Sequence, residues 1–119
     1  MVNGVPNRNE TATATIASGQ SLSDVIDLSG RNLTGILLPA AWTAADLTFS
    51  VSIDGVTYAD LYDETGEYAL VVGASVFSGI NIAPLMGFRY LKVRSGTSAS
   101  PVNQTADRDL VLTLGDFTR

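Results

Sequence analysis

The sequence WTAADLTFSVSIDGVTYADLY, residues 42–62, decides the fold class of this chain. Within it, apolar residues occupy every second position of the segment 47–53 and alternate with serine and threonine. This period of two residues is typical of a strand that buries one face. Asp54-Gly55 follows directly, and this dipeptide favours the positive φ angles of a tight type I′ turn. The stretch therefore predicts a β-hairpin whose second strand spans residues 56–62.

Similar short patterns occur along the rest of the chain. Turn-forming residues interrupt them at short intervals, and the alanine-rich segment 39–46 is too short to form a stable helix. Eight or nine short strands without helices are typical of an antiparallel β-sandwich or jelly roll, and we predict this all-β fold. Outside the hairpin, strands or short strand pieces are expected at residues 10–17, 24–28, 33–39, 67–72, 76–77, 80–82, 88–95 and 109–114.

The apolar residues of these strands predict which faces are buried. In residues 10–17, threonines alternate with alanine and isoleucine, which predicts a threonine-rich outer face. In residues 109–114, leucines at every second position should face the core. The run Ile36-Leu37-Leu38 predicts burial on both faces of its strand. Trp42 is expected to cover one end of the core.

The chain of 119 residues has the length of one domain. We expect a single β-sandwich domain over residues 10–119. The preceding residues 1–9, MVNGVPNRN, are polar, contain glycine and proline and show no periodicity, which predicts a flexible N-terminal arm. The alternative is an arm that becomes ordered against a neighbouring subunit.

Composition excludes several classes of function. The formal net charge of −5 argues against a nucleic-acid partner. The chain contains neither cysteine nor histidine, which excludes disulfides, thiolate nucleophiles, histidine-based triads and nearly all transition-metal sites. Charged residues make up only 16%, against about 25% in typical domains. A weakly charged surface is common in proteins that pack against copies of themselves, so we expect a homo-oligomer. Because the usual catalytic and metal-binding residues cysteine and histidine are missing, we also expect that the protein is no enzyme and carries no cofactor.

Targeting and membrane segments are not evident in the sequence. The beginning of the chain, MVNGVPNRNETATA, has no apolar core of a signal peptide, and the longest apolar run is far too short for a membrane span. We therefore expect synthesis in the host cytoplasm and no membrane partner.

Four carboxylates lie close together in the sequence, at Asp60, Asp63, Glu64 and Glu67. Carboxylate oxygens at such a corner could bind Ca²⁺, or two of them could form a glycosidase pair. However, the spacing differs from that of a calcium loop, and no aromatic-lined cleft is indicated. We expect these residues to be solvated turn residues and predict no metal site and no catalytic residue.

The candidate contact residues are aromatic, arginine and loop residues. Tyr58, Asp60 and Tyr62 should share one strand face, and such a row suits either a sugar ring or a subunit interface. Arginine is favoured at interfaces, where it could pair with the acidic corner of a neighbouring subunit. The loop 96–108 has thirteen residues without an apolar period, and loops of this length are often functional. The candidate interface or glycan contacts are Trp42, Tyr58, Asp60, Tyr62, Arg94, Ser98 and Asn103.

The hairpin carries a local resemblance to a sugar-binding family. Its sequence FSVSIDGVTYADLYD, residues 49–63, is similar to the S-x-D-G-x-x-[WY] hairpin of discoidin-like galactose-binding domains. This resemblance implies a β-sandwich that binds a glycan. It covers about fifteen residues, and hairpins of this kind recur in other folds.

A longer resemblance covers roughly residues 30–114. The turn 39–42, the Asp54-Gly55 hairpin, RYLKVRSGTS (89–98) and PVNQ (101–104) are similar to small β-sandwich proteins from head and tail gene clusters of tailed phages and prophages. This resemblance implies a virion structural protein, such as a capsid decoration or cement protein or a neck or tail component. Its partners would be copies of itself and other virion proteins such as the major capsid protein. A carbohydrate-binding module for attachment to glycans is the alternative.

Overall fold

The computed structural model describes residues 9–81, 83–85 and 87–115, and within them it contains ten strands and one short 3₁₀ helix. The prediction of an all-β antiparallel sandwich is confirmed, with ten strands where eight or nine were expected. The elements are β1 (Asn9–Ile16), β2 (Ile26–Asp27), β3 (Asn32–Leu37), β4 (Leu47–Ser52), β5 (Ala59–Asp60), β6 (Tyr62–Asp63), β7 (Gly66–Glu67), β8 (Phe77–Gly79), η1 (Ala83–Leu85), β9 (Tyr90–Ser95) and β10 (Arg108–Gly115).

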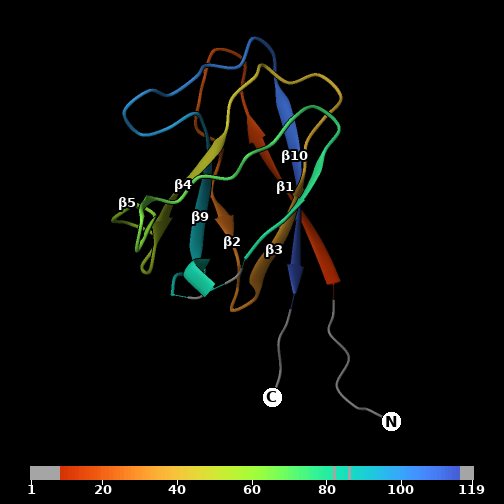
Figure 1. Ribbon diagram of the computed structural model, residues 1–119. Coiled ribbons are helices and arrows are strands. Elements are labelled where there is room, and N and C mark those ends of the chain that lie inside the picture. Colours follow the sequence, from red (N-terminus) through yellow and green to blue (C-terminus); the bar gives the residue numbers. More distant parts are fainter. Residues whose placement is uncertain (1–8, 82, 86, 116–119) are drawn as a thin grey trace.

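Two four-stranded sheets form the sandwich (Figure 1). Sheet A has the strand order β1-β10-β3-β8, and sheet B has the order β2-β9-β4-β5. Strands β6 and β7 form a separate two-stranded hairpin beside sheet B. All strand pairs are antiparallel, and residues 68–76 cross from the edge of sheet B to the edge of sheet A.

The core lies between the two sheets and is built from the inward residues of the long strands. In β10, Leu110, Leu112 and Leu114 are buried, as the alternation predicts. In β1, Ala14 and Ile16 are buried and the threonines lie on the outer face, which is also as predicted. The core further contains Ile26, Leu28, Leu33, Ile36, Leu38, Leu47, Phe49, Leu61, Leu85, Leu91 and Val93.

The hairpin of β4 and β5 is present, but its turn differs from the prediction. Ser50 pairs with Asp60 and Val51 with Ala59, so the connection is much longer than two residues. Among the described residues other than glycine, only Ser29 and Ser75 have positive φ, so Asp54 lacks the conformation of a type I′ turn. The type I′ prediction is therefore wrong, as is the second strand over 56–62, which is reduced to two-residue pieces.

Side chains replace the backbone ladder in this loop. The Asp54 carboxylate accepts hydrogen bonds from the backbone N–H of Val56 at 2.8 Å and of Thr57 at 2.9 Å. The Ser52 hydroxyl accepts one from the N–H of Gly55 at 2.9 Å. Such local bonds compete with strand pairing, and they explain why the alternation of β4 does not continue into a tight turn.

Other strand predictions need smaller corrections. Leu37 is 41% exposed on the outer face of sheet A, because the described residues leave that face uncovered there; its burial was predicted wrongly. The strand expected over 67–72 is reduced to β7 and an isolated bridge between Leu70 and Leu47. Of the pieces expected at 76–77 and 80–82, only Phe77 lies in a strand, β8; residues 80 and 81 belong to no strand, and residue 82 lies outside the described residues. Of the expected arm, residues 1–8 lie outside the described residues, and Asn9 begins β1.

Candidate functional site

Arg94 connects three elements on the outer face of sheet B. It lies on β9 opposite Thr48 of β4, and its side chain is only 13% exposed. One guanidinium nitrogen donates to an Asp60 carboxylate oxygen at 2.7 Å, and another donates to Glu67 at 3.2 Å and to the Thr48 hydroxyl at 3.3 Å. Arg94 therefore ties β5 and β7 to the centre of sheet B.

The carboxylate of Glu67 extends this contact into the loop after β9. Its two oxygens accept hydrogen bonds from the backbone N–H of Ser98 at 3.1 and 3.3 Å. We call the residues joined in this way, Thr48, Asp60, Glu67, Arg94 and Ser98, the Arg94 cluster. Hydrogen bonds between charged groups are stronger than neutral ones, and partial burial of Arg94 and Glu67 reduces their screening by solvent.

The cluster joins three of the residues singled out from the sequence, Asp60, Arg94 and Ser98. The acidic partners of Arg94 lie in its own chain. Glu67, which bonds to both Arg94 and Ser98, was missed, because the sequence placed it among solvated turn residues. The preference for arginine over lysine was the one signal that pointed to planar pairing with carboxylates here.

The predicted aromatic row on one strand face is wrong, because Tyr58 precedes β5, which contains Asp60, whereas Tyr62 lies in β6 of another sheet. The Lys92 ammonium lies 4.5 Å from the centre of the Tyr58 ring, a cation–π contact that covers one face of the ring. Asp60, between the tyrosines, is held by Arg94. Tyr62 is 61% exposed and lines an open pocket. Of these two tyrosines, Tyr62 is thus the one that is exposed and lines a pocket.

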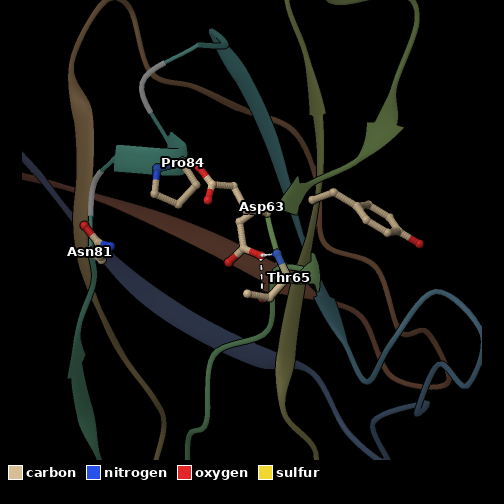
Figure 2. Close-up of a pocket in the computed structure, with 6 residues that line it drawn as sticks. Asp63, Thr65, Asn81 and Pro84 are labelled. Carbon is tan, nitrogen blue, oxygen red and sulfur yellow. Dashed lines mark hydrogen bonds between the residues drawn. The ribbon is translucent and has the colours of Figure 1, made fainter.

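That pocket has a volume of about 610 Å³ and lies between the β6–β7 hairpin and the segment around η1 (Figure 2). Asp63 and Thr65 lie on one side of it, and Asn81 and Pro84 lie across from them. The Asp63 carboxylate accepts bonds from the N–H of Thr65 at 2.8 Å and from its hydroxyl at 2.7 Å. These bonds lower the pKa of Asp63 below its usual value, so the carboxylate stays ionised as an acceptor facing the pocket.

The four carboxylates near the hairpin do not converge on one point. Asp60 and Glu67 pair with Arg94, and Asp63 bonds to its own turn. In the part of the chain that the structure describes, no group of three or more acidic residues is arranged to hold a metal ion.

An apolar groove of about 320 Å³ lies next to the pocket and shares Pro84 with it. Beside it, the loop after β4 exposes Ile53 to 77% and Val56 to 83%. The sequence pattern did not indicate this surface, because the alternation of residues 47–53 placed Ile53 on the inward face of a strand, whereas the strand ends at Ser52. The residues lining the apolar groove are Val51, Ser52, Ile53, Thr57, Ala59, Leu61, Pro84, Gly87 and Phe88.

Trp42 and Asn103 lie outside the Arg94 cluster, next in sequence to Thr43 and Gln104, which contact each other. Trp42 is partly buried against the core, as expected, and its indole N–H donates to the carbonyl of Ala45 at 3.2 Å. The buried Gln104 side chain donates to the Thr43 carbonyl at 3.0 Å and accepts from the Thr43 N–H at 2.9 Å. The loop 96–108 is therefore anchored at both ends, and Asn103 is exposed on it.

No helix among the described residues is long and apolar enough to cross a membrane.

Comparisons with known proteins show that this chain is similar in fold to solved structures. No family model matches the chain, and no curated protein matches it. Among solved structures, the SPBc2 prophage-derived protein YomS matches with a TM-score of 0.58 at 12% identity, over 96% of this chain and 100% of that one. A carbohydrate-binding module, CBM32-1 from a family 31 glycoside hydrolase from Clostridium perfringens, matches with a TM-score of 0.45 at 17% identity, over 85% of this chain and 75% of that one. The resemblance to prophage β-sandwich proteins is thus confirmed at the level of the fold.

Proposed function

We propose that this chain is a non-enzymatic structural protein of a phage particle, as a capsid decoration or cement protein or as a neck or tail component. The observation that carries the proposal is the match with a prophage-derived protein over 96% of this chain and the whole of the other. In this proposal the protein is made in the host cytoplasm, resides in the virion and binds neither nucleic acid nor membrane. It assembles with copies of itself and with other virion proteins, such as the major capsid protein.

The carboxyl groups support a non-enzymatic role. Hydrogen bonds lower the pKa of Asp27, Asp54 and Asp63. A lowered pKa makes a carboxylate a weak general base and its acid form scarce at neutral pH, which is unfavourable for acid–base catalysis. Asp60 and Glu67 hold Arg94 and position loops.

The apolar groove supports binding to another protein. Ile53 and Val56 are among the most exposed large apolar side chains of the described residues, and they lie beside a concave surface lined mainly by apolar groups. An exposed apolar surface next to a groove is typical of a protein contact site. We assign this surface to contact with another virion protein.

Particle purification tests the proposal. Phage particles from an induced host that carries the gene are separated on a density gradient, and this chain is quantified in the particle band. We expect it to band with the particles and to resist a salt wash. A chain found only in the soluble lysate contradicts the proposal.

Ile53→Asp then tests the contact surface. We expect about tenfold lower incorporation into particles, equivalent to a loss of ~1.4 kcal/mol of binding free energy. Val71→Asp is the matched control, because Val71 is also 77% exposed but lies outside the groove. Equal incorporation of the two variants contradicts the role of the groove.

A glycan-binding function is the second candidate, and the pocket beside Tyr62 favours it. An exposed aromatic ring next to polar acceptors can stack on a sugar and bond its hydroxyls. A glycan array with the purified protein tests this function. Tyr62→Ala should abolish binding, whereas Tyr58→Ala should retain it, because Lys92 already covers one face of the Tyr58 ring. Absence of binding on the array counts against this candidate.

A further inference from the structure

The outer edge of sheet A at β1 differs from the three other edges of the two sheets. The edge strands β2 and β5 have two residues each and β8 has three, whereas β1 has eight. A very short edge strand offers few free backbone groups to another chain, which is a common protection against unwanted pairing. Among the described strands, only β1 leaves a long edge open.

The direction of the free backbone groups of β1 follows from Thr15. Its N–H donates to the Asp24 carboxylate at 2.9 Å and its carbonyl accepts from the Asp24 N–H at 3.2 Å, so both groups point away from β10. Alternate residues of a strand direct their backbone groups to the same side. Asn9, Thr11 and Thr13 therefore also point theirs outward, and no described residue bonds to the outward groups of Thr11 and Thr13.

Devices that protect edge strands are missing from β1. Its pairing with β10 is continuous from Asn9 to Ile16 without a bulge, and the strand contains neither proline nor lysine. The one charged residue, Glu10, belongs to the inward-facing set and forms an ion pair with Arg31. The exposed side chains Thr11 and Thr13 are uncharged and β-branched, which favours strand pairing.

We propose that the β1 edge is a homodimer interface, at which β1 of a second copy pairs in an antiparallel manner across a two-fold axis. Such an interface is self-complementary, because each outward N–H meets a carbonyl of the same strand in the other copy. Thr11 faces the partner's Thr11, and Asn9 faces the partner's Thr13. This register leaves Thr15 with Asp24, and it sets Glu10 opposite the partner's Ala12, so that no like charges are opposed.

Another protein strand is a less suitable occupant. The chain carries a net charge of −5, yet the open edge between Thr11 and Thr13 is neutral and offers no charge complementarity to a different partner. Pairing with its own copy joins two four-stranded sheets into one of eight strands with a shared threonine face. This dimer specifies the self-association within the proposed function and rests on it.

The test is the molar mass of the purified full chain by light scattering, for wild type and two variants of Thr11. Wild type should have twice the monomer mass. Thr11→Pro removes an outward N–H, which an edge strand tolerates, so we expect a folded monomer with an unchanged circular dichroism spectrum. Thr11→Val keeps both backbone groups and should remain a dimer. If Thr11→Pro does not fold, Thr13→Lys places a charge on the same edge and should give the monomer.

Hydrogen exchange provides an independent measurement. In the dimer, the amides of Thr11 and Thr13 should exchange more slowly as the protein concentration rises, whereas those of Ala12 and Ala14, which face β10, should not change. A wild-type monomer, a dimer that persists in Thr11→Pro and Thr13→Lys, or a monomeric Thr11→Val overturns the proposal. Particle purification distinguishes the two proposals. If the protein is a dimer but is absent from phage particles, only the proposed virion function is overturned. If it is incorporated into particles as a monomer, only the proposed β1 dimer interface is overturned.

Discussion

The β1–β10 pair and the segment 59–79 show two different ways in which this chain is held together. Strands β1 and β10 pair over eight consecutive residues, with inward leucine, isoleucine and alanine. In 59–79, no strand exceeds three residues. Scattered backbone bonds, such as those between Leu70 and Leu47, are supplemented there by the side-chain bonds of Arg94 and Asp63. A ladder is encoded locally by alternation. Side-chain anchoring depends on residues far apart in the sequence.

The largest expected effect lies in the ladder. Leu112→Ala removes a fully buried side chain of β10 and should lower the free energy of unfolding by about 2–5 kcal/mol, because a cavity remains between the sheets. Leu37→Ala is the matched control, since Leu37 is 41% exposed on the outer face, and it should cost less than about 1 kcal/mol. Urea unfolding measures both. Equal losses would mean that the outer face of sheet A is covered in solution.

The difference between the two regions also explains how much was predictable from the sequence. The positions of β1, β9 and β10 and the inward residues of β10 follow from the alternation of apolar and polar residues, because this pattern can be recognised from neighbouring residues alone. The exposure of Ile53 did not follow, because the bonds of Ser52 and Asp54 end the strand one residue earlier.

The candidate site was predictable only in part. Asp60, Arg94 and Ser98 were singled out, but Ser98 is joined to Arg94 only through Glu67, whose partners lie 27 and 31 residues away. Gln104 was missed for the same reason, because its role depends on Thr43, 61 residues earlier. Pairs of side chains so far apart in the sequence form no repeating pattern, so a single sequence does not predict them.

The next effect tests the side-chain anchoring. Arg94→Met leaves Asp60 and the half-buried Glu67 without their cation, and we expect a loss of about 1–3 kcal/mol. Hydrogen exchange should accelerate in residues 59–67 and at Ser98, while β1 and β10 remain protected. Arg89→Met is the control, because its pair with Asp27 is exposed and should contribute less. Uniform acceleration over the whole chain would contradict local anchoring.

A smaller effect is expected where the two regions meet, at β3 and β8. A Cβ atom on Gly35 would lie 2.3 Å from the Phe77 ring, so Gly35→Ala must displace this half-exposed side chain. We expect a loss of about 1–2 kcal/mol, because the ring can move outward. In the background of Phe77→Ala the same change should cost less, and urea unfolding of the four proteins measures the coupling. Additive effects would contradict the close contact.

The smallest effect concerns pH and the exposed pair at the edge of sheet B. Arg89 donates to both Asp27 oxygens, at 2.9 and 3.1 Å, and these bonds, together with bonds from Ser29, lower the pKa of Asp27 from 3.8 to about 2. Because the folded state binds this proton more weakly than the unfolded state, the pair stabilises the fold fully above about pH 4. This contribution is lost as the pH falls towards 2. A carboxyl titration by NMR should show the low pKa in wild type and a higher value in Arg89→Met, where the Ser29 bonds remain. The same pKa in both proteins would mean that Arg89 does not hold Asp27 in solution.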